Sequence, residues 1–244
     1  MSALTFELKH MPDQRLDLSP LVPAKLAGLN RKEIEALQIG TTRQKLTVGD
    51  AFKVKGKDSN TLHFAGTDAR CDKIGAQLSG GEIHVEGDVG AYLGTFMKSG
   101  KIAVRGSTGA LAAASMAGGH IAIWRNVGDQ ACGVGVGDTM GMKGGFVTIG
   151  GNAGGRMIAG TLLLKRGAGR YAGFGNRRGS LIFTEKPRDI LPTYSDCGVM
   201  EFDYLRLLEQ WLRGQGMSIR LGAKARRLMG DMAVLGKGEM LILA

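Results

Sequence analysis

The stretch that decides the fold begins at Glu82 and reads EIHVEGDVGAYLGTFMKSG; nineteen residues later Lys101 opens KIAVRGSTGALAAASMAGG. Thr61 opens an earlier and slightly longer copy. A repeat of about 20 residues in a glycine-rich chain predicts a solenoid, in which each unit buries its apolar face against its neighbours. The pattern restarts with HIAIWRNVGD at His120, FVTIGGNAGGRMIAG at Phe146, TLLLKRGAGRYAGFGNRRG at Thr161 and SLIF at Ser180.

Each repeat begins with a short alternating stretch, of which Ile83 and Val85 are one example. Successive side chains of a strand point to opposite faces, so these apolar pairs are expected to face the core. A following glycine such as Gly87 permits the positive φ angles that a corner requires. The unit is too short for a strand, a helix and two loops. We therefore expect an all-β-dominated fold: a right-handed parallel β-helix of rungs about 19 residues long over residues 61–184.

Equal offsets in successive rungs should stack about 4.8 Å apart, which predicts particular neighbours. Glu82 should lie beside Lys101, and Glu86 beside Arg105. Both are pairs of opposite charge, which support the register. The rung from His120 is longer than the others, and its surplus, GDQACGVGVGDTMGMKGG, is expected to leave the coil as a loop on one face.

The segments outside the repeat are expected to cover the two ends of the coil, where strand edges would otherwise be unpaired. Residues 1–60 are predicted to form an N-terminal cap. Residues 185–244, where the repeat stops, are predicted to form a C-terminal helix and tail. The helix should run from Glu201 to Arg213 and end at Gly214, because one face carries apolar residues at helical spacing: Phe202, Leu205, Leu208 and Leu212.

One row of side chains points away from the core, between the inward pairs. It becomes apolar along the chain: His63, His84, Ala103, Ala122, Thr148, Leu163 and Ile182. A sheet that is apolar on both faces is buried on both faces. Either the C-terminal helix or another protein is therefore expected to cover Leu163 and Ile182. Together with the C-terminal segment, this row is expected to make the chain an obligate partner subunit that is poorly soluble when expressed alone.

Composition limits the class of protein. The chain has 244 residues, 43% hydrophobic and only 6% aromatic, with 40 glycines, most of which the rungs explain. The sequence contains no run of 18 apolar residues, so no membrane span is predicted. The N-terminus does not resemble a signal peptide. The three cysteines, Cys71, Cys132 and Cys197, form no CxxC motif. We expect a cytoplasmic protein with free thiols and no structural zinc or iron–sulfur site.

The net charge of +10 is spread unevenly. A basic field attracts polyanions. Nucleic acid, an acidic protein surface and a polycarboxylate ligand all fit such a field, although low aromatic content argues against a single-strand binder that stacks bases. Ordinary solvated surface charge is the simplest alternative. Between positions 151 and 184 there are six cations and no acid: Arg156, Lys165, Arg166, Arg170, Arg177 and Arg178.

No catalytic or metal-binding constellation stands out. GVGVGD at 133–138 lacks the last glycine and the following helix of a dinucleotide fingerprint. GTFMKSGKI at 94–102 has a spacer that is too long for a P-loop, and Ile102 occupies the Ser/Thr position. His63 and His84 share an offset and are expected to stack, but a metal would need further ligands. We therefore predict no catalytic residue and no metal site.

The rungs and the tail RRLMGDMAVLGKGEMLIL at 226–243 together resemble a known family. The rungs resemble the β-helix shared by the C-terminal region of glutamate synthase large subunits and the C (gamma) subunit of formylmethanofuran dehydrogenase. The tail, with G-D followed by G-K-G-E, looks like the end of the C (gamma) subunit. Two kinds of complex share that subunit: the molybdenum or tungsten dehydrogenase of methanogens and the formyltransferase/hydrolase complex of methylotrophic bacteria.

The resemblance implies a non-catalytic scaffold subunit of the formyltransferase/hydrolase complex, in one-carbon metabolism that oxidises formaldehyde. The implied partners are amidohydrolase-like, formyltransferase-like and molybdopterin-subunit-like chains, without nucleic acid or membrane. The family works with a methanofuran-type carrier that bears glutamates, so the six cations named above would hold that polyglutamate tail. No cofactor is expected on this chain alone.

Three alternatives remain open on the sequence. One is the gamma subunit of molybdenum or tungsten formylmethanofuran dehydrogenase in methanogenesis. Another is a glutamate-synthase-like β-helix domain or a free-standing β-helix enzyme. The last is a basic nucleic-acid-binding module. Co-purification separates them first, because only a subunit requires partner chains.

Overall fold

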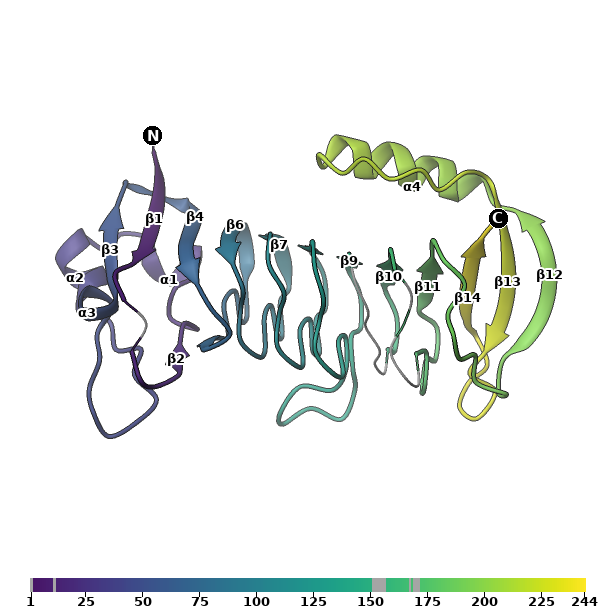
Figure 1. The fold of residues 1–244 in the computed structure, drawn as a ribbon, viewed down its shortest axis with the longest axis horizontal. Helices are drawn as coiled ribbons and strands as arrows, with labels where there is room; N and C mark the ends of the chain where they lie inside the picture. The colour runs from purple at the N-terminus through teal and green to yellow at the C-terminus, as the bar shows by residue number, and fades with distance from the viewer. Residues whose placement is uncertain (1, 11, 151–156, 167, 169–171) are drawn as a thin grey trace.

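The chain forms an elongated molecule in which strands stack side by side along the long axis (Figure 1). The computed structural model describes all residues except 1, 11, 151–156, 167 and 169–171. Twelve strands make one sheet, in the order β12-β13-β14-β11-β10-β9-β8-β7-β6-β4-β1-β3. The expectation of a strand-dominated protein is confirmed.

The central strands follow one another in the sheet in the same order as in the sequence, and every neighbouring pair is parallel. Ile83 pairs with Ile102, and Ile102 pairs with Ile121. All three are buried, so their predicted stacking in the core is confirmed. The strands are β4 (Asp58–Thr67), β6 (Ser79–Gly87), β7 (Ser99–Val104), β8 (His120–Ile123), β9 (Phe146–Ile149), β10 (Thr161–Leu164) and β11 (Ser180–Phe183).

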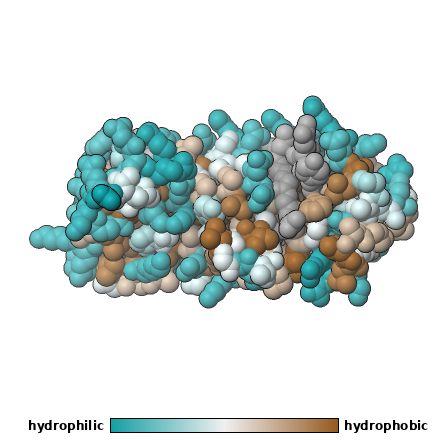
Figure 2. Space-filling model, turned by 90° about the horizontal axis from the view of Figure 1, so that it is seen from below, coloured by the Kyte–Doolittle hydropathy of each residue, from teal (hydrophilic) through white to brown (hydrophobic). Residues whose placement is uncertain are grey.

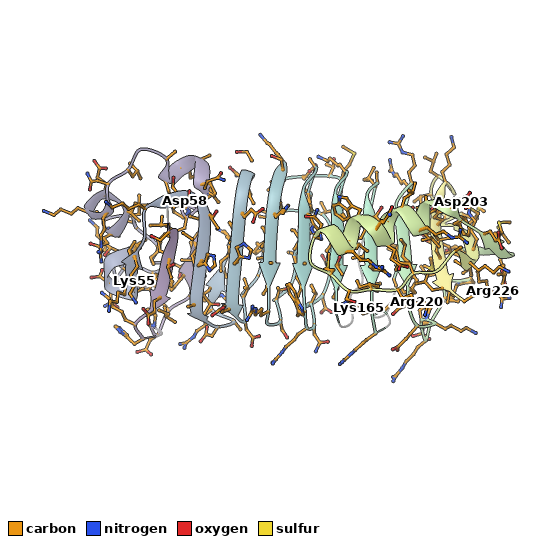
Figure 3. The ribbon with its side chains drawn as sticks, turned by 90° about the horizontal axis from the view of Figure 1, so that it is seen from above. Lys55, Asp58, Lys165, Asp203, Arg220 and Arg226 are labelled. Atoms are coloured by element: carbon orange, nitrogen blue, oxygen red, sulfur yellow. The ribbon has the colours of Figure 1, made fainter. Side chains whose placement is uncertain are left out.

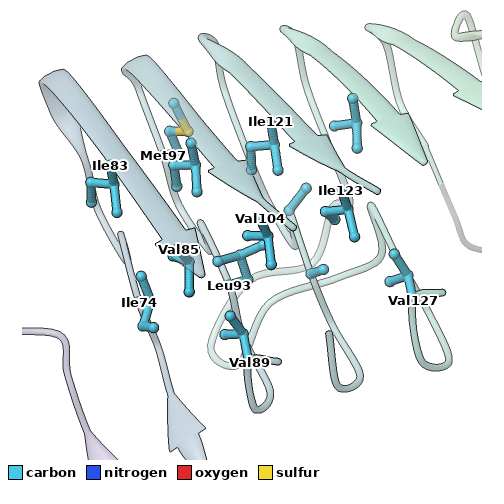
Figure 4. Close-up of a cluster of buried hydrophobic side chains, with 14 of the residues drawn as sticks. Ile74, Ile83, Val85, Val89, Leu93, Met97, Val104, Ile121, Ile123 and Val127 are labelled. Atoms are coloured by element: carbon cyan, nitrogen blue, oxygen red, sulfur yellow. The ribbon is translucent and has the colours of Figure 1, made fainter. Parts of the chain in front are cut away.

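The core is a continuous column of apolar side chains inside the coil (Figure 4). The strands supply one wall, including Ile83 and Val104, and the return segments supply the other, including Leu93 and Met97. Parallel bridges also link the corners of successive rungs, as between Val89 and Thr108. Each rung is therefore buried against the rungs before and after it, as the repeat predicts.

Glycine is required where a return segment crosses this core. Gly75 and Gly94 have φ angles of +67° and +59°. A Cβ at Gly75 would lie 2.4 Å from Cδ1 of Ile102, and one at Gly94 would lie 2.4 Å from Cδ1 of Ile121. Any other residue would collide with the isoleucine of a following rung, which explains part of the unusual glycine content.

The two predicted charge ladders are present on the surface of the sheet. Glu82 Oε1 lies 3.2 Å from Lys101 Nζ, and Glu86 Oε1 lies 3.8 Å from Arg105 Nη1. These groups are exposed, so each pair contributes little stability. They do confirm the predicted register.

The N-terminal segment closes one end of the sheet. β1 (Ala3–Leu8) pairs parallel with β4 and antiparallel with β3 (Phe52–Lys55). Phe6 stacks on Phe64 with ring centroids 5.0 Å apart, and Phe52 packs edge-on against both rings. The remaining elements here are β2 (Leu16–Asp17), α1 (Pro23–Leu26), α2 (Arg31–Glu35), α3 (Val48–Ala51) and β5 (Cys71–Asp72).

The surplus of the long rung leaves the coil as a loop between β8 and β9, as predicted (Figure 1). Ser115 Oγ accepts a hydrogen bond from the Gly135 N–H and donates one to the Met140 carbonyl, each at 2.9 Å. Asp138 pairs with Lys143 at 2.8 Å. The Lys143 ammonium and the backbone N–H of Thr139 lower the pKa of the Asp138 carboxyl to about 2. Polar contacts thus tie the loop to Ser115 and link residues within the loop itself.

The sheet continues beyond the expected end of the repeat. β14 (Gly238–Leu243) adds to β11 as another parallel strand, with Met240 opposite Leu181. β13 (Lys224–Gly230) and β12 (Ser195–Glu201) then follow antiparallel. The sheet therefore extends beyond residue 184, because the chain first makes β12, α4 and β13 and then returns to the stack with β14.

The C-terminal helix covers the outer face of the sheet. α4 runs over Asp203–Gly214, so it begins two residues later than predicted, ends at Gly214 as predicted, and is followed by the positive φ of Gly216. Leu205 and Leu212 pack on the outer row of the sheet, where Leu163 and Ile182 are fully buried. The chain's own helix covers this row, which is one of the two possibilities that the sequence left open, so the row itself leaves no apolar surface for a partner. No described helix is long and apolar enough to span a bilayer.

Ile102→Ala should lower the free energy of unfolding by about 2–5 kcal/mol, because truncation leaves a cavity that adjoining rungs cannot fill. Denaturant unfolding measures this loss. The neighbouring variant Lys101→Ala is the control, since it removes only an exposed ion pair. Equal losses in the two variants would contradict the core position of Ile102.

Candidate functional site

The predicted basic strip is divided between two edges of the sheet. Lys165 and Arg166 directly follow β10, whereas Arg177 and Arg178 lie just before β11. β10 and β11 are parallel neighbours, so the first pair lies at the carboxyl ends of the strands and the second at their amino ends. The described cations form two pairs separated by the width of the sheet rather than one row. Outside the described residues lie Arg156 and Arg170.

Arg177 shares its offset with two further cations that the sequence analysis did not recognise. Rung-to-rung hydrogen bonds place Lys98, Lys143 and Arg177 at one offset on alternate rungs, and Ala117 and Ile158 occupy that offset on the rungs between them. Arg178 shares its own offset with Lys237, because β11 and β14 pair Ser180 with Glu239. The offset of Lys98, Lys143 and Arg177 from their strands could have been read from the sequence. The offset of Lys237 could not, because it depends on the pairing of β14 with β11.

A second basic feature lies at α4. A hollow of about 440 Å³ lies between α4 and the segment that returns from it, and three of its lining residues are Arg206, Arg213 and Arg220. Arg213 is paired with Glu209. In the view from above, Arg220 lies on the same edge of the sheet as Lys165 (Figure 3).

Glu209 is held inside this hollow by backbone groups. Its Oε2 accepts hydrogen bonds from the Leu221 N–H at 2.8 Å and the Gly222 N–H at 3.3 Å. The hydrogen bond from Leu221 is the main reason that the pKa of Glu209 lies below its ordinary value. The carboxylate therefore ties the returning segment to α4, and the surrounding field remains basic.

The four described cations of the predicted strip are available to a ligand. Lys165 is half-buried, and Arg166, Arg177 and Arg178 are exposed. Among the described residues, no carboxylate forms an ion pair with any of the four. At the amino ends of the strands, the nearest acid in the strand register is Glu239, which is bound by Arg227 at 2.9 Å and by Ser180 Oγ at 2.8 Å. At the carboxyl ends, the register of β10 and β11 places Glu185 opposite Arg166, without an ion pair between the two. An anionic ligand would therefore meet four cations that form no ion pair within the described chain, with one acid beside the carboxyl-end pair.

Exposed apolar side chains gather in the C-terminal half of the chain. Among the described residues, Leu29 is the one such side chain before position 124. Figure 2 shows apolar regions in the middle and toward one end of the face seen from below. Surfaces of this kind mark sites of interaction with other proteins. The others are Trp124, Val136, Met140, Phe174, Val199, Met200, Tyr204, Leu207, Trp211, Met232, Val234 and Leu235.

Side chains suited to catalysis or metal binding do not cluster in the described part of the chain, where no group of three His, Cys, Asp or Glu residues could hold a metal. His63 and His84 stack with ring centroids 4.9 Å apart, as predicted. Burial raises the pKa of the Cys71 and Cys132 thiols to about 11 and about 12, so neither is a thiolate at neutral pH.

His120 joins α4 to the sheet. Its ring centroid lies 5.6 Å from that of Phe146 and 5.2 Å from that of Trp211 on α4. Its Nε2 atom is buried and makes no hydrogen bond within the described chain. Burial lowers the pKa of His120 to about 4, so the imidazole is neutral at pH 7.

The chain is thus a strand-dominated repeat protein whose sheet grows by one parallel strand per repeat, with basic edges and exposed apolar side chains toward its C-terminus. No family model matches it. It is similar to a solved structure, the formyltransferase/hydrolase complex FhcABCD from Methylorubrum extorquens in complex with methylofuran. The identity is 36%, the TM-score is 0.82, and the match covers 98% of this chain and 99% of the other.

Relatives of known function identify the family. The C subunit of the formyltransferase/hydrolase complex Fhc from Methylorubrum extorquens is 44% identical over 89 residues, 36% of this chain and 34% of the relative. The C subunit of the tungsten-containing formylmethanofuran dehydrogenase 2 from Methanothermobacter marburgensis is 30% identical over 99 residues, 38% and 37% of the two chains. These matches span little more than a third of each relative. Together with the full-length structural match, they show that the chain belongs to the family of C subunits of formyltransferase/hydrolase complexes and formylmethanofuran dehydrogenases.

Acidification should weaken the attachment of α4 through His120. Because the folded-state pKa of about 4 lies below the ordinary value of 6.5, the unfolded chain binds more protons between these two values. Stability is therefore complete above pH 6.5 and falls as the pH drops toward 4. From pH 7 to pH 5 the loss should be on the order of 1–2 kcal/mol.

Denaturant unfolding at the two pH values measures this loss. His120→Phe keeps an aromatic ring against Phe146 and Trp211 but cannot be protonated, so it should flatten the dependence. Equal pH slopes for the wild type and this variant would show that another group titrates.

Proposed function

We propose that this chain is the C subunit of a formyltransferase/hydrolase complex in one-carbon metabolism and serves it as a non-catalytic scaffold. The observation that carries the proposal is the 36% identity over 98% of the chain to a structure of such a complex. In this proposal the coil is a right-handed parallel β-helix, the form that gives the sheet one strand per rung. The complex works in the cytoplasm, in keeping with three free cysteines.

The scaffold role assigns formyl transfer and hydrolysis to partner chains of formyltransferase-like and amidohydrolase-like type. The exposed apolar side chains of the C-terminal half support this assignment. A rigid stack of rungs can hold two partners at a fixed separation, because neither the core nor the rung-to-rung hydrogen bonds allow neighbouring rungs to slide.

The second part of the proposal concerns the carrier. The relative's structure contains methylofuran. A methanofuran-type carrier with a polyglutamate tail would present repeated carboxylates, which match the unpaired cations at the two edges of the sheet. Lys165 and Arg166 would hold one part of the tail, and Arg177 and Arg178 another. Arg156 and Arg170, which lie in the same sequence segment, are proposed to bind the tail as well.

The gamma subunit of a tungsten formylmethanofuran dehydrogenase is the second candidate, supported by 30% identity over 38% of the chain. A redox complex would contain tungsten or molybdenum and a pterin, whereas a hydrolytic complex would not. Metal and pterin analysis of the native complex separates these two.

The paired substitution Arg177→Glu/Arg178→Glu should leave the complex assembled and reduce retention of the carrier at least severalfold, with a further decrease in retention as salt is added. Lys165→Glu/Arg166→Glu tests the other edge of the sheet in the same way. Carrier content of the purified complex, measured by mass spectrometry, is the readout. Arg43→Glu, an exposed cation far from both edges, is the control.

Two results would contradict the carrier proposal. One is full carrier retention in both paired variants at moderate salt. The other is failure of assembly together with undiminished carrier on the isolated partner chains, which would show that these cations contact an acidic protein surface instead.

A further inference from the structure

The two ends of the sheet are finished differently (Figure 1). At the N-terminal end, β3 is the last strand, and the short helices α2 and α3 pack beside it. Its outward side chains are Lys53 and Lys55, which are charged and exposed. Lysines and covering elements are the devices by which proteins prevent an edge strand from pairing with another chain. The N-terminal edge is protected in both ways.

At the C-terminal end, β12 is the last strand, and among the described residues no helix or loop packs over its edge. The register shifts between Asp196 and Val199, so the regular part of this edge is Val199–Glu201. Six of its seven residues are exposed, on both faces of the sheet, and Gly198 is half-buried. Val199 is 61% exposed and Met200 is 40% exposed. A strand that contributes to a protein's own core is buried on at least one face. In the described part of the chain, β12 is held by its pairing with β13 alone.

The backbone of β12 has one free edge. The Phe202 N–H donates to the Ala223 carbonyl on the β13 side. N–H groups of alternate residues in a strand point to the same side, so the Met200 N–H also points toward β13. The N–H groups of Val199 and Glu201 therefore point away from the sheet, where no described strand pairs with them.

The side chains along this edge define what fits it. Asp196 is paired with Arg226, and Glu201 with Lys224 at 3.4 Å, so the charges are already balanced within the chain. Val199 lies opposite Arg226, on the face of the sheet that carries the core. Met200 lies opposite Ala225, on the face that α4 covers. A neighbouring strand would meet one apolar side chain on each face and no unpaired charge.

We propose that β12 is the docking edge for a strand of a partner subunit, which pairs with the free N–H and carbonyl groups of Val199 and Glu201 and places apolar side chains beside Val199 and Met200. Strand addition of this kind supplies main-chain hydrogen bonds for affinity and side-chain contacts for specificity. The inference rests on the proposed function only in requiring that the chain belongs to a multi-subunit complex.

Amide hydrogen exchange tests the pairing directly. In the isolated full chain, the Val199 and Glu201 amides should exchange rapidly, while those of Met200 and Phe202 should be protected by β13. In the assembled complex, the Val199 and Glu201 amides should become at least tenfold slower to exchange. If the complex assembles and these two amides exchange as fast as in the isolated chain, the inference is wrong, whereas failure of the wild-type chain to enter any complex would contradict the proposed function instead.

Substitution gives an independent readout. Val199→Pro removes an outward N–H without breaking the ladder to β13, because proline is tolerated where the N–H of an edge strand faces solvent. It should keep the wild-type melting temperature and lose at least tenfold in affinity for the partner chains, measured by native mass spectrometry of the purified complex. Val199→Thr keeps the N–H and a β-branched side chain, and it should assemble normally.

Two outcomes would overturn the inference. If Val199→Pro retains the complete set of partner chains at wild-type affinity, no strand pairs with this edge. If the wild-type chain forms a dimer that Val199→Pro converts to monomer while all other chains remain bound, the occupant of the edge is a second copy of this chain and not a partner.

Discussion

The hydrogen bonds between successive rungs are the constraint on which the structure depends. Each strand of the coil contributes only a few inward side chains, too few to form a core without neighbours. Parallel pairing sets those side chains in register, so that Ile83, Ile102 and Ile121 form a column. The glycines at the corners, the surface charge pairs and the cover of α4 all follow from this register.

The register also decides where charge lies, which explains why the candidate site differs from the sequence expectation. Residues close together in the sequence, such as Arg166 and Arg177, lie at opposite ends of neighbouring strands. Residues far apart in the sequence, such as Lys98 and Arg177, share an offset. The electrostatic field around a coil depends on where each charged residue lies within its rung. The net charge of a sequence segment therefore does not show where on the surface the field is positive.

The repeat made most of the coil predictable, because a period of alternating apolar residues determines strands, inward faces and neighbours together. Three features were outside its reach. β14 returns to the stack after a long non-repeating segment, and its pattern alone does not reveal which edge it joins. The sequence left open whether α4 or another protein covers Leu163 and Ile182, since both satisfy the same apolar row. The division of the cations between the two edges of the sheet could be seen only when the structure had placed each cation within its rung.

The one-strand rung has a geometric consequence for assembly. Each added or deleted rung changes the length of the coil by about 4.8 Å, while the end structures remain intact. In the proposed scaffold role, insertion or loss of whole repeats would adjust the distance between the partners that the coil holds. The coil would then act as a molecular ruler, graduated in steps of one rung, and its two dissimilar ends would give that ruler a direction.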